Sequence, residues 1–179
     1  MRAVLSGMFL AAVASMAQAQ SGSPVPVTVD NFARAESDLY LNNAVKDAGG
    51  IGKLLHHREP ARIDKQPVIR MNRDTLYSSA VIDLDAGPVT VEMPDAGKRF
   101  MSLQVINEDH YTRNVFYGTG SHKLNRSSVG TRYALLAFRT LVDPNDPGDI
   151  KQVHALQDAI KIDQEAQGKL ELPNWDQAS

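Results

Sequence analysis

The middle of the chain contains, at residues 85–97, the sequence DAGPVTVEMPDAG. Apolar side chains at Val89, Val91 and Met93 alternate there with polar ones, and a period of two is typical of a β-strand with one buried face. The DAGP and DAG segments on either side consist of residues that favour tight turns. This stretch therefore predicts a half-buried strand between two turns.

Similar runs, rich in β-branched and aromatic residues, lie on both sides of this strand. Clusters of Gly, Pro, Asn and Asp separate them, so we expect strands at residues 68–71, 75–84, 89–93, 100–106, 111–117 and 133–138. Their hairpin-like spacing favours antiparallel pairing over a parallel sheet with crossover helices. The sequence predicts a mainly β, α+β fold with an antiparallel β-sandwich-like core, an N-terminal helix and a C-terminal helix.

Helical periodicity is found before and after the predicted strands. The first helix is expected from an N-cap at Asp30 to Ala48, where two glycines end it, with Arg34 and Asp38 pairing on its exposed side. The second helix is expected after an N-cap at Asp146, with a proline at its first position and an apolar face within residues 150–160.

Residues 1–19 have the pattern of a secretory signal peptide. Arg2 precedes an uncharged apolar run at residues 3–16, and a small-x-small site ends before Gln20. We therefore expect a periplasmic or secreted protein. The rest divides into a flexible leader at 20–29, a β-sandwich-like domain at 30–163 and a polar tail at 164–179. One reading of this tail is the start of a linker to a second domain.

The charge, the apolar segments and the motifs of the chain argue against several classes of binding partner. The net charge of −2, with no cluster of Lys and Arg, argues against nucleic-acid binding. After signal cleavage no apolar segment is long enough to span a membrane. No motif for a phosphate, dinucleotide or zinc site is present, so no metal ion and no cofactor are expected.

The first cluster of polar residues lies between two predicted strands. It contains Asn72, Arg73, Asp74 and Tyr77, which we consider candidate ligand-binding residues. An arginine can bind an anionic group through two parallel hydrogen bonds. The alternative is a structural turn stabilised by Asn72 and an Arg73–Asp74 ion pair.

The second cluster follows the strand predicted at 100–106. Asp109 and His110 are candidate catalytic residues, and Glu108 and Tyr111 are candidate ligand-binding residues. A carboxylate and an imidazole can move a proton near neutral pH. Consecutive strand residues point to opposite faces, however, so a shared site requires a turn here, and an ordinary hairpin turn is the alternative.

The middle of the chain resembles the bacterial family catalogued as domain of unknown function 1254. The resemblance lies in residues 70–78, 83–89, 94–100 and 104–111, which occur in order with strand-like spacing. It implies a β-sandwich-rich fold with helical flanks and supplies no catalytic assignment. Similar proteins continue into a second β-rich domain, so this chain resembles the N-terminal half of that arrangement, and a site between two domains would be only partly present.

Two functions follow from these observations. The first is an exported ligand-binding or assembly module, whose partner is a C-terminal domain, a second copy of the chain or a small molecule. The second is a hydrolase that uses the Asp109 and His110 region, with Arg73 as an anion clamp. The sequence leaves open whether the protein is an enzyme.

Overall fold

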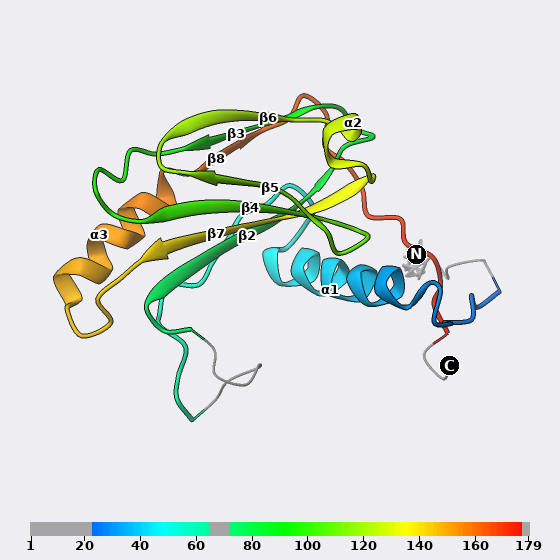
Figure 1. Cartoon of the computed structure of the whole chain (residues 1–179), viewed down its shortest axis with the longest axis horizontal. Helices are drawn as coiled ribbons and strands as arrows, with labels where there is room; N and C mark the ends of the chain where they lie inside the picture. The colour runs from blue at the N-terminus through cyan, green and yellow to red at the C-terminus, as the bar shows by residue number, and fades with distance from the viewer. Residues whose placement is uncertain (1–22, 65–71, 177–179) are drawn as a thin grey trace, which may run out of the picture.

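The computed structural model describes residues 23–64 and 72–176, which form two antiparallel sheets with helices beside them (Figure 1). The signal peptide predicted at 1–19 and the strand predicted at 68–71 lie outside the described residues. The five-stranded sheet has the order β1 (Leu55–His56), β2 (Thr75–Asp83), β7 (Tyr133–Leu141), β4 (Met101–Asn107) and β5 (Thr112–Tyr117). The three-stranded sheet has the order β6 (Gly120–Leu124), β3 (Val89–Met93) and β8 (Lys161–Asp163). The helices are α1 (Phe32–Ala48), α2 (Arg126–Val129) and α3 (Pro147–Asp158).

The predicted mainly β fold with a sandwich-like core is confirmed. The runs at 75–84, 89–93, 100–106, 111–117 and 133–138 correspond to β2, β3, β4, β5 and β7. Strand β6 was not predicted, because its sequence begins at Gly120 and contains mostly polar residues. It forms because β3 supplies a paired neighbour over its whole length.

The core lies between the two sheets. Val89, Val91 and Met93 face it from β3, as their alternation predicted, and all three are buried. Leu103 of β4 and Phe138 of β7 are paired neighbours that face it from the other sheet, and both are fully buried. Burial of these apolar side chains provides the main stabilisation of the fold.

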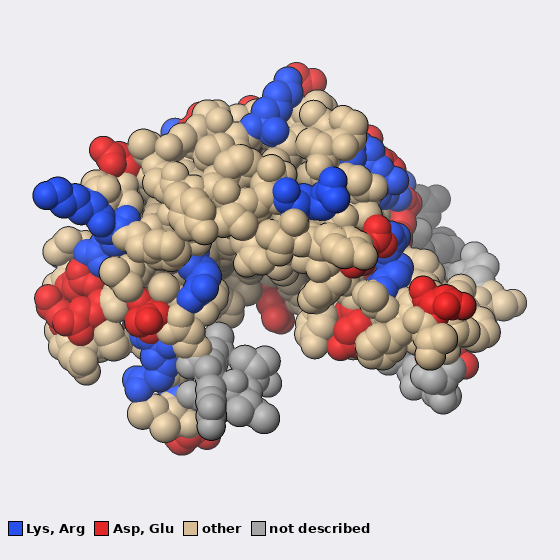
Figure 2. Space-filling model, in the orientation of Figure 1, with Lys and Arg blue, Asp and Glu red and all other residues tan. Residues whose placement is uncertain are grey.

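The five-stranded sheet has a second face, turned away from the three-stranded sheet, which we call the outer face. Val81 of β2 and Leu135 of β7 lie on it, and they pack with Leu41 of α1. Helix α1 lies beneath one end of β2 and β7, next to residues 164–176 (Figure 1). Figure 2 shows the surface hollowed below the sheet.

Helix α1 begins one residue later than predicted. Asn31, not Asp30, is the N-cap, and its Oδ1 accepts a hydrogen bond from the backbone N–H of Thr28 at 2.7 Å. The helix ends at Gly49 as expected, with the left-handed φ of 75° that glycine adopts readily. The exposed Arg34–Asp38 pair does not form, because Arg34 binds acidic residues after β4 and Asp38 is buried.

The second predicted helix is α3. The Asp146 side chain accepts a hydrogen bond from the backbone N–H of Gly148 at 2.8 Å, and Pro147 is the first helical residue. Val153 is fully buried against Leu76 and Val142. None of the helices in the described ranges combines the length and apolar character that a membrane span requires.

Residues 164–176 lie against the domain. The Gln164 side chain donates hydrogen bonds to the carbonyls of Asp83 and Gly87, and Leu170 and Leu172 pack against the cluster that contains Leu41. Val25 forms a parallel bridge with Trp175, so the segments predicted as leader and tail meet each other.

Candidate functional site

The two predicted polar clusters lie at opposite ends of the five-stranded sheet. Thr75 pairs with Leu141 at one end of the β2–β7 ladder, and Asp83 pairs with Tyr133 at the other. Arg73 and Asp74 precede the first end, whereas residues 108–110 follow Asn107 near the second. Eight residue steps along a strand correspond to about 26 Å. The proposed combination of Arg73 with Asp109 and His110 in one site is therefore wrong.

The carboxylates of the second cluster fasten α1 to the turn after β4. The Glu108 Oε2 accepts a hydrogen bond from the Tyr133 backbone N–H at 2.9 Å, and its Oε1 lies 3.5 Å from Nη1 of Arg34. Asp109 accepts hydrogen bonds from Nε and Nη2 of Arg34. Burial lowers the pKa of Arg34, but these carboxylates raise it by more, so the guanidinium stays charged. Both carboxylates thus have structural partners.

The histidine of this cluster points to a different partner. His110 has a φ of 65°, and its Nδ1 lies 3.2 Å from Oγ of Ser37 on α1. Asp109 and His110 therefore diverge instead of acting as an acid–imidazole pair. Tyr111 is exposed. Sequence reasoning missed Ser37, because the fold alone brings it to a histidine 73 positions away.

The first cluster contains the turn that the alternative reading described. The Asn72 Oδ1 accepts the Asp74 backbone N–H at 2.9 Å, and the Asp74 carbonyl accepts the Val142 N–H at 2.8 Å. Asp74 is exposed, and no ion pair with Arg73 forms among the described residues. Instead, the Arg73 Nε is buried without a hydrogen-bond partner. The first cluster is therefore a structural turn that leaves one arginine nitrogen unpaired among the described residues.

Tyr77 belongs to a row of outer-face side chains that crosses four strands. It lies opposite Arg139 of β7, Arg139 lies opposite Ser102 of β4, and Ser102 lies opposite Tyr117 of β5. The guanidinium carbon of Arg139 is 5.6 Å from the centroid of the Tyr77 ring, within cation–π distance. Sequence reasoning missed Arg139, because the strand predicted at 133–138 stopped one residue short of it.

Unpaired polar atoms concentrate at this end of the sheet. Of the five buried side-chain N and O atoms without a partner in the described residues, three belong to Arg73 (Nε), Thr75 (Oγ1) and Arg139 (Nε). Thr75 is only 4% exposed. An unpaired buried polar group costs about 1–3 kcal/mol, so native proteins rarely keep several in one place without a function.

A cavity of about 250 Å³ lies between α1 and the outer face. Most of its wall is apolar, from Leu41 and Ala44 of α1 and from Ile106 and Leu135 of the sheet. Ser79 also lines it and lies two residues from Tyr77 on the same face of β2. The cavity therefore comes within two strand residues of Tyr77, although neither Tyr77 nor Arg139 lines it.

Comparison with known proteins gives a family and a fold. Residues 51–127 match the family described as protein of unknown function (DUF1254). Over this stretch the chain is similar to the DUF1254 family. The matched DUF1254 segment contains Arg73, Thr75, Tyr77 and residues 108–111, but it ends before Arg139. No curated protein matches the chain.

Among the solved structures, one from Vibrio parahaemolyticus shares the fold of this chain. The VPA0106 protein from Vibrio parahaemolyticus superposes with a TM-score of 0.59 over 83% of the chain, at 19% sequence identity. The chain spans 41% of the length of that protein. In the ranges 23–64 and 72–176 no group of three or more metal-ligating side chains could hold an ion.

Proposed function

We propose that this chain is a small-molecule binding module, exported from the cell, whose ligand is a carboxylate with an apolar body. The observation that carries the proposal is the set of buried, unpaired polar atoms on Arg73, Thr75 and Arg139 beside an apolar cavity. A partner surface made only of apolar side chains would leave these donors unsatisfied, so a ligand with acceptor oxygens fits better.

The carboxylate and the apolar body of the ligand would bind at different places in the site. The carboxylate accepts from the guanidinium of Arg139, which already lies against the Tyr77 ring, and from Arg73 at the same end of the sheet. The apolar body enters the cavity bounded by Leu41 and Leu135. Ser79 and Tyr77 are two strand residues apart, about 6.6 Å, so one small molecule can reach both places.

Octanoate is a suitable probe, because it combines a carboxylate with an unbranched apolar chain. Isothermal titration calorimetry should show saturable binding of octanoate and much weaker binding of 1-octanol, which has the same chain without the charge. Arg139→Gln should weaken octanoate binding about tenfold or more, because a hydrogen bond to a charged group contributes about 1.5–3 kcal/mol.

Two further variants separate the parts of the proposal. Arg113→Gln is the matched control, because Arg113 is an exposed arginine on the same sheet, and octanoate should bind this variant as it binds the wild type. Ala44→Phe places a ring in the cavity and should block octanoate. Equal octanoate affinity in Arg139→Gln and the wild type, with both proteins folded by circular dichroism, would refute the site.

A hydrolase is the second candidate function, with Ser37 and His110 as its pair of residues in place of Asp109 and His110. The observation in its favour is the 3.2 Å separation of Ser37 Oγ and His110 Nδ1 on the wall of the same cavity. Hydrolysis of 4-nitrophenyl butyrate that is lost in both Ser37→Ala and His110→Ala would support it. Turnover that survives Ser37→Ala would exclude this serine as the nucleophile.

Export is tested independently of binding. Expression of the full chain in a Gram-negative host should yield a periplasmic protein whose intact mass corresponds to a chain that begins at Gln20. A cytoplasmic protein that retains residues 1–19 would contradict export.

A further inference from the structure

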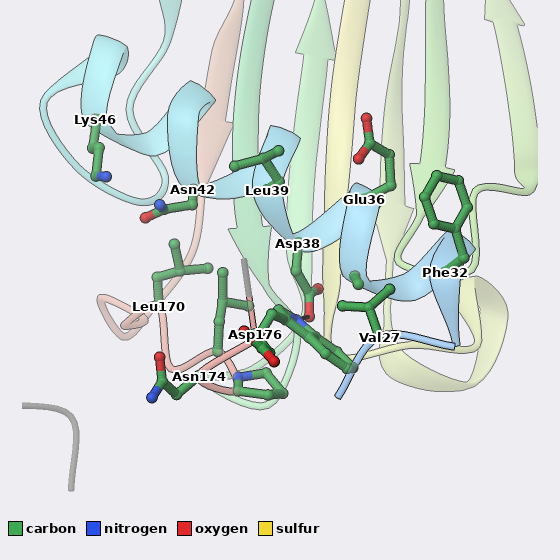
Figure 3. Close-up of a pocket in the computed structure, with 14 residues that line it drawn as sticks. Val27, Phe32, Glu36, Asp38, Leu39, Asn42, Lys46, Leu170, Asn174 and Asp176 are labelled. Carbon is green, nitrogen blue, oxygen red and sulfur yellow. Dashed lines mark hydrogen bonds between the residues drawn. The ribbon is translucent and has the colours of Figure 1, made fainter. Parts of the chain in front are cut away.

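A second cavity lies between α1 and residues 170–176. It measures about 550 Å³ and is enclosed by α1 and by residues 170–176. Figure 3 shows this cavity, which we call the tail pocket, with the side chain of Asp38 pointing from α1 towards the residues of the tail. None of its lining residues lies in the site at the Tyr77–Arg139 pair.

Asp38 is the polar group at the centre of the tail pocket. It is 1% exposed, and its Oδ2 accepts a hydrogen bond from Nε1 of Trp175 at 2.9 Å. Its other oxygen, Oδ1, is buried without a hydrogen-bond partner. A buried carboxylate needs a cation or several donors to offset its lost hydration, and this one has a single neutral donor.

The nearby cations do not neutralise Asp38. Arg34, one helical turn earlier, is occupied by Glu108 and Asp109, and the charges of these two carboxylates add to the negative potential at Asp38. Lys46 lines the pocket eight residues further along α1, about 12 Å away. Burial raises the pKa of Asp38 above its usual range, and the charges of Glu108 and Asp109 add to this rise, whereas the hydrogen bond from Trp175 and the charge of Arg34 lower the pKa by less. A positive charge next to Oδ1 would therefore be stabilised.

The remaining walls suit the apolar part of a ligand. The rings of Trp175 and Phe32 and the side chains of Leu170 and Leu172 line the pocket. Two further carboxylate residues, Glu36 and Asp176, line it as well. Aromatic faces also attract cations. An aromatic wall beside a buried carboxylate is the chemistry that recognises organic ammonium ions.

We propose that the tail pocket binds a small organic amine in its ammonium form, with one N–H donating to Oδ1 of Asp38 and the hydrocarbon part against Trp175 and Leu172. This site does not depend on the carboxylate site of the proposed function. Its amine is held between α1 and residues 170–176, so binding fastens this segment to the domain.

Phenethylamine is the probe, and 2-phenylethanol is its neutral counterpart. Trp175 is the only tryptophan of the chain, so its indole N–H gives a single resolved peak in a ¹⁵N-correlated NMR spectrum. Phenethylamine should shift this peak saturably, whereas 2-phenylethanol at the same concentrations should not. A peak that stays in place up to 10 mM phenethylamine would overturn the proposal.

Asp38→Asn removes the charge and keeps an oxygen that can accept from Trp175. It should weaken phenethylamine binding about tenfold or more. Asp47→Asn is the matched control, because Asp47 is an exposed aspartate of the same helix outside the pocket, and this variant should bind as the wild type does. Unchanged affinity in folded Asp38→Asn would overturn the assignment of Asp38.

Phenyltrimethylammonium tests the hydrogen bond itself, because it carries the positive charge without an N–H group. Its binding is measured on the wild-type protein, so the test does not depend on whether Asp38→Asn folds. We expect it to bind at least about tenfold more weakly than phenethylamine. Equal binding of the two cations would overturn donation to Oδ1.

Discussion

The ion pair of Arg99 and Asp149 joins the end of the five-stranded sheet to α3, and its removal should destabilise the fold measurably. The guanidinium of Arg99 donates two hydrogen bonds to Asp149 and a third, at 2.7 Å, to the carbonyl of Leu141, two residues from Arg139. Asp149 also accepts the backbone N–H of Asp143 at 2.8 Å. Both side chains are mostly buried, at 18% and 17% exposure.

The size of the effect follows from the pKa of Asp149. The hydrogen bonds from Arg99 and from the Asp143 backbone lower this pKa from 3.8 to about 2. One pKa unit corresponds to about 1.4 kcal/mol, and the residual solvent exposure reduces the gain, so the pair contributes about 2 kcal/mol. Asp149→Asn should lower the free energy of unfolding at pH 7 by about 1–2 kcal/mol, since the amide keeps part of the hydrogen bonding.

The pH dependence has a defined sign. Because the folded-state pKa is depressed, the stabilisation is fully present above pH 3.8 and is lost as the pH falls towards 2. Urea unfolding of the wild type and of Asp149→Asn at several pH values measures this directly. Their difference should shrink between pH 4 and pH 2.

Asp158→Asn is the comparison on the same helix. Asp158 pairs with Arg58 and is 63% exposed, so solvent screens this pair and the variant should lose much less stability than Asp149→Asn. A loss at Asp158 equal to that at Asp149, or a difference between wild type and Asp149→Asn that does not change with pH, would refute the reasoning.

Three further changes test the packing that positions the two sites. Gly168→Ala should lower the melting temperature by several degrees, because the added Cβ would lie 2.3 Å from Cβ of Asp83; a melting temperature equal to that of the wild type would contradict this packing. Arg34→Gln should lower the free energy of unfolding in urea by about 1–3 kcal/mol, because it removes the cation beside the buried Glu108 carboxylate. An unchanged free energy of unfolding would show that Glu108 does not need this cation. Phe138→Ala should cost about 3–5 kcal/mol, because the ring is fully buried between the sheets, and a loss below 1 kcal/mol would place this ring outside the core.

The strand pattern was predictable because it is local. The alternation of Val89, Val91 and Met93 depends on neighbours two positions away, and β3 has the predicted bounds. The caps of α3 were predictable for the same reason, since Asp146 bonds a residue two positions later. Strand β6 was missed because its partner strand, rather than its own sequence, stabilises it.

The sites were only partly predictable because they depend on distant pairings. Arg73 and Tyr77 stood out as a polar cluster, but Arg139 joins them only through the register of β2 and β7. Asp38 had the pattern of an exposed helix residue, and it is buried because Trp175 returns from 137 positions away. Arg34 was assigned a partner on its own helix, yet it binds Asp109 across the fold.

In the proposed function, the unpaired Nε–H groups of Arg73 and Arg139 donate to a carboxylate, and NMR of these groups detects whether they do so. Titration of the ¹⁵N-labelled protein with octanoate should shift the Nε–H peaks of Arg73 and Arg139. The Nε–H peak of Arg132, which already donates to Asp83 at 3.0 Å, should stay in place. If the Arg73 and Arg139 peaks do not move while octanoate binds, or if it does not bind at all, the outer face is not a carboxylate site.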